Sequence, residues 1–64
     1  MNIDHETLLS ERKEFMELSG MKSNREYLEA LLLFAHEAID DGDYIEAKNA
    51  INKCIFFVYY KDEL

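Results

Sequence analysis

The chain contains a single cysteine, Cys54, no proline, no tryptophan and only two glycines. One cysteine excludes an intramolecular disulfide and a cysteine-rich zinc site. We expect a single helical domain over residues 1–64, which is close to the lower size limit for folding on its own core. Without disulfides or a structural metal, such a domain depends on efficient helix packing or on a partner subunit. Because 48% of the residues are hydrophobic, we expect a homodimer that shares a core.

Basic residues are also scarce, since seven Lys and Arg stand against 14 Asp and Glu, for a formal net charge of −7. Contacts to phosphate require a basic face, so we expect no direct binding to nucleic acid and none to anionic membranes. The expected partner is another protein with a basic surface. The alternative is an acidic mimic of nucleic acid, of the type made by phages and mobile elements, which would occupy the basic groove of a DNA- or RNA-binding protein.

Targeting and membrane signals are not evident. No apolar run approaches the ~18 residues of a membrane span, and the first residues do not have the pattern of a signal peptide. The last four residues, KDEL, spell the retention signal of the endoplasmic reticulum. Because nothing in the sequence directs the chain into that lumen, we interpret this match as a coincidence and expect a cytoplasmic protein.

The spacing of apolar residues predicts an all-α domain of three helices, at about residues 5–19, 24–41 and 44–61. The first has a thin apolar stripe, and we expect it to cover a core made elsewhere. Its charged residues are expected on the exposed faces: Glu11, Arg12, Lys13, Glu14 and Glu17. The second helix is apolar on every face over residues 30–35, so we expect it to be the buried centre.

The ends of these helices are marked by capping and turn residues. Two Ser/Asp-x-x-Glu sequences have the spacing of a capping box. The expected first-turn caps are Asp4, Ser23 with Glu26, and Asp43 with Glu46, and the expected stops are Gly20 and Gly42. The run CIFFVYY, residues 54–60, also has strand propensity. We favour helix because no second strand is available, and an intermolecular sheet is the alternative.

The second and third predicted helices form an antiparallel hairpin around Gly42, and this hairpin resembles a single tetratricopeptide repeat over Leu31 to Cys54. In its most specific part, GDYIEA, Gly42 matches the turn glycine, Tyr44 the aromatic residue between the helices, and Ala47 the small residue at their contact. The other matching positions are Leu31, Phe34, Ala35, Ala38, Ile51 and Cys54.

The chain also departs from the pattern of that family. Ala38 stands where the family has a tyrosine, Ala35 where it has a glycine, and no proline closes the unit. Repeat architectures need about three copies to bury a continuous core. A lone hairpin must therefore be capped by the first helix or stack with other chains in an oligomer.

The resemblance implies a peptide or protein ligand, bound along the first helix of the hairpin. The corresponding positions are Glu29, Leu32, His36 and Asp40. Acidic residues are also dense in this region: residues 26–47 contain seven Asp and Glu and no Lys or Arg. We therefore predict a partner-binding surface that consists of Glu29, His36, Glu37, Asp40 and Asp41.

Two of these acids, Asp40 and Asp41, are expected at a helix C-terminus, where a negative charge costs about 0.3–1 kcal/mol. A local cost without an evident structural return is typical of a functional site. The alternative reading is a solvated acidic face.

A cluster of aromatic residues near the C-terminus is the second candidate surface. Phe56, Phe57, Tyr59 and Tyr60 span too much of a helix to face one intramolecular core. Aromatic residues are enriched at protein interfaces, so we predict a homodimer interface there. Contact with another protein and internal packing are the alternatives.

No catalytic constellation is evident. Cys54 lies in an apolar stripe, where a thiol is normally inert, and we expect structural roles for His5 and His36. His36 and Asp40 could supply two zinc ligands, with Asp41 or Asp43 as a third. The acidic turn does not have the spacing of a calcium-binding loop. We expect no metal, no cofactor and no enzymatic activity. The sequence predicts a protein-binding regulator or adaptor.

Overall fold

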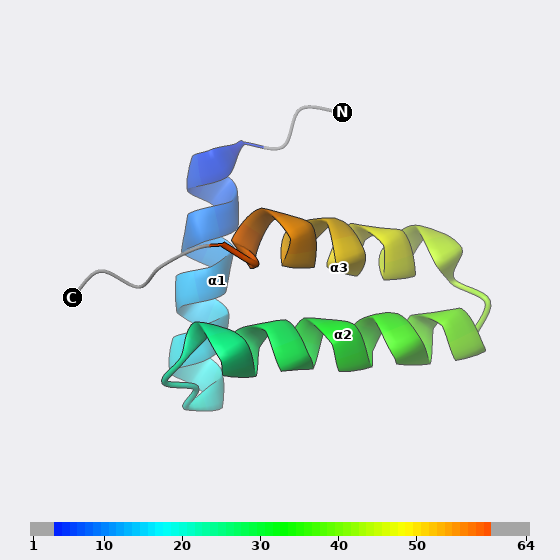
Figure 1. Ribbon diagram of the computed structural model, residues 1–64, viewed down its shortest axis with the longest axis horizontal. Helices are drawn as coiled ribbons and strands as arrows, with labels where there is room; N and C mark the ends of the chain where they lie inside the picture. The colour runs from blue at the N-terminus through cyan, green and yellow to red at the C-terminus, as the bar shows by residue number, and fades with distance from the viewer. Residues whose placement is uncertain (1–3, 60–64) are drawn as a thin grey trace.

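Three helices make up the fold, and they follow the predicted order. The computed structural model describes residues 4–59, with α1 at His5–Ser19, α2 at Asn24–Asp40 and α3 at Tyr44–Phe57 (Figure 1). The predicted all-α fold of three helices is therefore confirmed. No strand occurs within residues 4–59, so the strand alternative is wrong for residues 54–59. The predicted end of the third helix, near residue 61, lies outside the described residues, and within them α3 ends at Phe57.

Each helix begins at the predicted capping residue. The side chains of Asp4, Ser23 and Asp43 accept hydrogen bonds from the backbone N–H groups of Glu6, Glu26 and Glu46. These bonds satisfy donors that have no partner within the helix. In a capping box, the Glu26 side chain would accept from the backbone N–H of Ser23. Here the Ser23 hydroxyl, rather than its N–H, donates to Glu26 Oε1 over 3.5 Å.

The two glycines end α1 and α2 as predicted. Gly20 has φ +70° and Gly42 has φ +79°, a left-handed conformation that is strained for other residues. At the hairpin turn, the Gly42 N–H donates to Ile39 O over 3.0 Å, and the Asp43 N–H donates to Ala38 O over 2.8 Å. α3 can therefore start immediately after α2 stops.

Small side chains allow α2 and α3 to approach closely along the hairpin. Ala35 and Ala38 of α2 are buried against Ala47 and Ala50 of α3, with Leu31 packed beside them. Ala47 thus lies at the contact between the helices, as expected. Tyr44, which was also expected there, is 67% exposed, so that prediction is wrong. The reason is that Tyr44 is the first residue of α3 and lies next to the turn, where α2 has already ended.

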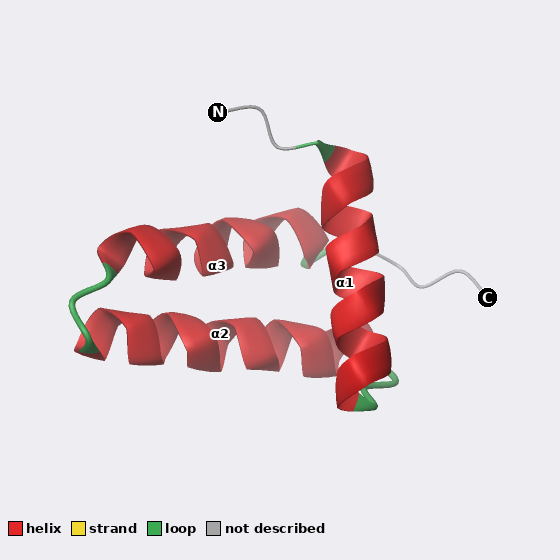
Figure 2. Cartoon of the chain, turned by 180° about the vertical axis from the view of Figure 1, so that it is seen from behind, coloured by secondary structure: helices red, strands yellow, loops and turns green. Residues whose placement is uncertain are grey.

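α1 crosses one face of the hairpin at the end opposite the turn (Figure 2). A second buried cluster forms at this crossing from Leu8 of α1, Tyr27 of α2 and Phe57 of α3. The rings of Tyr27 and Phe57 meet edge to face, with centroids 5.5 Å apart, and Phe15 of α1 meets Tyr27 in the same way at 5.9 Å. Such pairs add about 0.5–1.5 kcal/mol each beyond the burial of their area.

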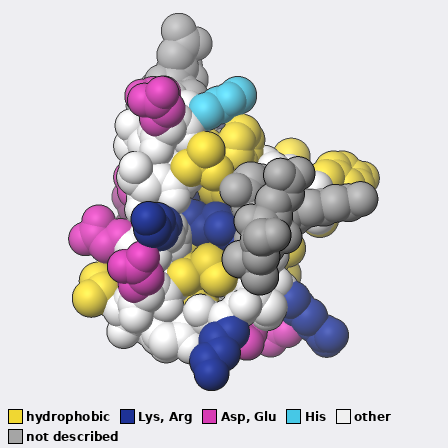
Figure 3. All heavy atoms as spheres, turned by 90° about the vertical axis from the view of Figure 1, so that its left-hand side faces the viewer, with side chains coloured by type: hydrophobic (Ala, Val, Ile, Leu, Met, Phe, Trp, Pro, Cys, Tyr) yellow, Lys and Arg dark blue, Asp and Glu magenta, His cyan; other side chains and the backbone are white. Residues whose placement is uncertain are grey.

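Arg12 is buried in this crossing, which contradicts its predicted exposed position. Its guanidinium carbon lies 5.8 Å from the ring centre of Tyr27 and 5.5 Å from that of Phe57, and its Nε donates to Asn24 Oδ1 over 3.1 Å. Only 8% of the residue is exposed. A planar guanidinium can stack on rings and still donate hydrogen bonds, so the charge remains satisfied inside the core. At this end of the molecule, basic side chains lie beside hydrophobic ones near the centre, while acidic ones lie mostly along one edge (Figure 3).

The expectation that α2 forms the buried centre is wrong. Leu32, Leu33 and Phe34 are all exposed, by about half or more of their surface. α1 covers only one end of one hairpin face, and α3 covers only one side of α2 (Figures 1 and 2). Because α1 and α3 alone cannot cover every face of α2, several large apolar side chains stay on the surface.

Candidate functional site

The five residues predicted as a partner-binding surface are all exposed, but they do not form one surface. Glu29, His36 and Asp40 lie on the side of α2 that points away from α3. Two of them are in ion pairs along the helix: Arg25 Nε lies 3.1 Å from Glu29 Oε1, and His36 Nδ1 lies 3.6 Å from Asp40 Oδ2. Exposed pairs of this kind contribute little to stability.

The other two predicted residues, Glu37 and Asp41, lie together on a different flank of α2. They line a hollow at the turn end of the hairpin, with a volume of about 250 Å³. Phe34 and Ala38 form the apolar part of its lining, and the remaining lining residues are Asp43 and Glu46 of α3. Four carboxylates therefore surround one exposed phenyl ring.

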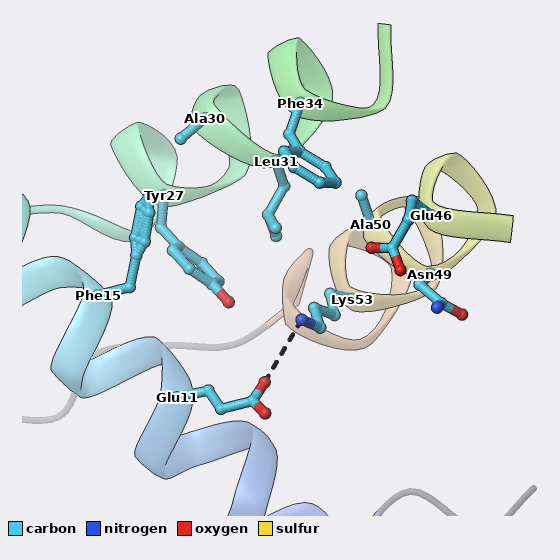
Figure 4. Close-up of a pocket in the computed structure, with 10 residues that line it drawn as sticks. All are labelled: Glu11, Phe15, Tyr27, Ala30, Leu31, Phe34, Glu46, Asn49, Ala50 and Lys53. Atoms are coloured by element: carbon cyan, nitrogen blue, oxygen red, sulfur yellow. Dashed lines mark ion pairs between the residues drawn. The ribbon is translucent and has the colours of Figure 1, made fainter. Parts of the chain in front are cut away.

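A second hollow, of about 240 Å³, lies in the corner between α1, α2 and α3, and we call it the deep hollow (Figure 4). Its apolar lining consists of Phe15, Tyr27, Ala30, Leu31, Phe34 and Ala50. Its polar lining comes from Glu11 of α1 and from three residues of α3, which are Glu46, Asn49 and Lys53. Lys53 Nζ lies 3.4 Å from Glu11 Oε2, so this ion pair bridges α1 and α3 at the edge of the hollow.

A third hollow continues this surface along α1, where Glu14 and Leu18 join Glu11 and Phe15. The deep hollow shares Glu11 and Phe15 with this third hollow, and Phe34 and Glu46 with the hollow at the turn. The three hollows are therefore continuous. We call this surface the acidic groove, and its lining carboxylates are those of Glu11, Glu14, Glu37, Asp41, Asp43 and Glu46.

The charge of the acidic groove is one-sided. Among the described residues that line its three hollows, Lys53 is the single basic one, and it is paired with Glu11. The groove runs along α2 from Tyr27 to Asp41, a rise of about 21 Å at 1.5 Å per residue. This length matches an amphipathic helix of about four turns.

The four aromatic residues predicted as a dimer interface do not share one surface. Phe57 has 0% of its surface exposed and packs on Leu8 and Tyr27, so it belongs to the intramolecular core and the prediction is wrong for this residue. Phe56 is half-buried between the rings of Phe57 and His5, at centroid distances of 4.8 and 4.9 Å. Tyr59 is 90% exposed, and Tyr60 lies outside the described residues.

Groups with chemical reactivity are few in this part of the chain. Cys54 is half-buried, with its Sγ 3.9 Å from Leu28 O, and burial raises the pKa of its thiol. Within residues 4–59, no three His, Cys, Asp or Glu side chains are grouped so that they could hold a metal ion. His36 and Asp40 are adjacent, but Asp41 and Asp43 line the acidic groove on another flank.

Sequence reasoning missed the contribution of α1 to the groove. Phe15 and Glu11 were assigned to a cover helix, although they form one wall of the deep hollow. A signal was available for the α2 side of the groove, where Phe34, Glu37 and Asp41 follow each other at helical spacing. This arrangement places one aromatic ring between carboxylates and could have separated Glu37 and Asp41 from the other acids.

Within residues 4–59, no helix is long and apolar enough to cross a membrane. No protein-family model, curated protein or solved structure matches this chain.

Proposed function

We propose that this protein is a non-enzymatic protein-binding regulator or adaptor, and that its acidic groove takes up a basic amphipathic segment of a partner protein. The observation that carries this proposal is the combination of an exposed apolar floor, centred on Phe15 and Phe34, with six carboxylates along its edges.

The apolar floor supplies the driving force for binding. Phe15 is 38% exposed and Phe34 is 49% exposed, so both rings have surface to bury against a ligand. An amphipathic helix that lies in such a groove presents apolar residues at positions i, i+3, i+4 and i+7. Its Lys and Arg residues would then flank the apolar stripe and meet the carboxylates at the edges.

The carboxylates supply selectivity and fast association. Opposite charges on two surfaces steer their encounter and disfavour partners of the wrong sign. Asp41 is informative because it caps the C-terminus of α2, where its negative charge opposes the helix dipole. Interaction with a cationic partner would compensate this cost. The resemblance of the hairpin to a tetratricopeptide repeat supports the same class of ligand, although the groove uses other residues than those that the resemblance implies.

A synthetic peptide tests the proposal directly. The probe is an amphipathic helix of about four turns with Leu and Phe on one stripe and Lys on both flanks, and the matched control has Glu in place of Lys. We expect saturable binding of the basic peptide in calorimetry and no binding of the acidic one. Phe34→Ala should weaken binding at least tenfold, which is about 1.4 kcal/mol.

Two charge reversals on α2 separate the acidic groove from the rest of the acidic surface. Asp41→Lys lies in the groove and should weaken binding of the basic peptide, whereas Asp40→Lys lies on the outer side of α2 and should leave it unchanged. Equal effects of both substitutions would contradict the proposal. If oligolysine without apolar residues binds as tightly as the amphipathic peptide, and moderate salt abolishes both, the result supports the nucleic-acid mimic instead.

A further inference from the structure

The hairpin has a second apolar surface, on the side opposite the acidic groove. It consists of Leu32 and Ile39 of α2 together with Tyr44, Ile51, Ile55 and Val58, of which the last follows the end of α3 directly. These residues are between 39% and 67% exposed. We call this surface the open face.

Helix geometry places these residues on one side of the molecule. Ala30 and Phe34 of α2, and Asn49 and Lys53 of α3, line the deep hollow beside α1. A shift of two residues turns a side chain about 200° around the helix axis, so Leu32, Ile51 and Ile55 point away from that hollow. α1 lies behind the hairpin in Figure 1 and in front of it in Figure 2, so no described helix covers the open face.

The open face differs from the rest of the surface in its charge. None of its six residues is charged. At its edge on α2, the carboxylates of Glu29 and Asp40 lie against the basic side chains of Arg25 and His36. The chain carries a formal net charge of −7, so two copies repel each other wherever their carboxylates face. Two open faces can therefore meet through uncharged side chains, with the nearest carboxylates of α2 at the edge of the contact and beside basic side chains.

The spacing of these residues is that of helices packed side by side. Leu32 and Ile39 are seven residues apart, and Tyr44, Ile51 and Val58 repeat the same interval on α3. A seven-residue interval keeps apolar side chains on one seam between helices that cross at about 20°. Two hairpins joined in this way form a four-helix bundle.

We propose that the open face binds the open face of a second copy of this chain, so that the two hairpins form a four-helix homodimer. The exposed fractions of the six residues correspond to about three whole large side chains, or roughly 500–650 Å² at about 150–200 Å² each. This area is at the upper end of what monomers leave exposed. It forms the centre of an interface of standard size, which buries about 800 Å² per partner. The interface differs from the predicted aromatic cluster, because it excludes the buried Phe57.

Analytical ultracentrifugation of the full chain over a micromolar concentration series tests the proposal. We expect a monomer–dimer equilibrium that Ile55→Lys weakens at least tenfold. The matched control is Ile45→Lys, because Ile45 is also an exposed isoleucine of α3 but lies on another flank. Both substitutions change the net charge equally, so net charge cannot explain a loss of the dimer in only one of them.

Leu32→Lys, on α2, provides a second disruption in case Ile55→Lys alters the helix, and circular dichroism checks the fold of each variant. A chain that stays monomeric throughout the series, or that loses its dimer equally with Ile45→Lys, overturns the proposal. Binding of the basic peptide to the acidic groove is measured on the same variants. We expect it to be unchanged by Ile55→Lys, so failure of the dimer and failure of the groove are separate results.

Discussion

We expect substitutions of Phe57 to have the largest effect on the stability of the domain. It has no exposed surface, and among residues 4–59 it is the largest fully buried side chain. Its ring packs edge to face on Tyr27 and Phe56, with centroids 5.5 and 4.8 Å away, and Arg12 lies over it at 5.5 Å. Replacement of a buried Phe by Ala costs about 3–5 kcal/mol, through lost burial and the cavity that remains.

This cost is comparable to the whole stability of the domain. At roughly 0.05–0.15 kcal/mol per residue, a chain of this size has a free energy of unfolding of about 3–10 kcal/mol. We therefore expect Phe57→Ala to be largely unfolded or close to it. Phe57→Leu, which keeps most of the volume, should fold with a loss on the order of 1–2 kcal/mol. Urea denaturation followed by circular dichroism measures both.

Tyr59 is the matched control, because it is an aromatic residue two positions later with 90% of its surface exposed. Tyr59→Ala should change the free energy of unfolding by no more than about 0.5 kcal/mol. If Tyr59→Ala costs as much as Phe57→Leu, or if Phe57→Ala leaves the urea midpoint unchanged, the assignment of Phe57 to the core is refuted. The comparison also separates a core role for Phe57 from the predicted dimer role. Loss of a core side chain lowers the free energy of unfolding at every protein concentration, whereas the effect of losing a dimer contact depends on concentration.

Three further predictions concern charge, pH and thiol reactivity. Asp41→Ala should raise the free energy of unfolding by about 0.3–1 kcal/mol, because it removes a negative charge from the C-terminus of α2. Asp43→Ala should lower it by about 1 kcal/mol, because it removes the N-cap of α3; urea midpoints that shift in the same direction would contradict this reasoning. Burial, and after it the charge of Glu11, raises the pKa of Tyr27 above 10.0. The neutral phenol therefore contributes its full stabilisation below the pKa of the unfolded state, and this contribution is lost as the pH rises through the pKa of the folded state. Urea midpoints measured against pH should therefore fall more steeply above about pH 10 for the unmodified chain than for Tyr27→Phe, and parallel curves would speak against the effect. Burial also raises the pKa of the Cys54 thiol, so iodoacetamide should alkylate it more slowly in the folded protein than in urea; faster alkylation when folded would indicate an activated thiol.

Local signals in the sequence determine the helices of this protein and their ends. Ser23, Asp43, Gly20 and Gly42 act within a few residues of their own position, and the structure has all four in the predicted roles. The Ala47 contact was expected from the resemblance to a tetratricopeptide repeat, and Ala47 is buried against α2.

Tertiary placement could not be predicted in the same way. Arg12 looks like a surface residue in sequence, and it is buried because α1 crosses the hairpin where the rings of Tyr27 and Phe57 meet. The position of that crossing depends on the path of the short segment between α1 and α2, in which Gly20 and Ser23 mark the helix ends but do not determine the angle between the helices. The exposure of Leu33 has the same origin, since helical periodicity gives the apolar faces of a helix but not the number of neighbours that cover them.

The acidic groove was predicted in part, through Glu37 and Asp41. The prediction joined them to Glu29, His36 and Asp40, which the resemblance to a tetratricopeptide repeat implies, whereas side chains at these positions point to different sides of α2. The wall of the groove that α1 provides depends on the same crossing as Arg12. The burial of Arg12 and this wall of the groove, which sequence reasoning both missed, therefore follow from one tertiary contact.

The crossing of α1 at one end of the hairpin also implies that the two ends open with different ease. Near α1 the hairpin is held by Tyr27 and Phe57, whereas the buried cluster nearer the turn consists of small side chains such as Ala38 and Ala47. Amide hydrogens around the turn should therefore exchange with solvent through local opening, while those beside Tyr27 exchange only when the whole domain unfolds. The most acidic part of the groove lies on the end that opens more easily. A bound segment would slow exchange there most, because it would cover apolar side chains that the three helices leave exposed.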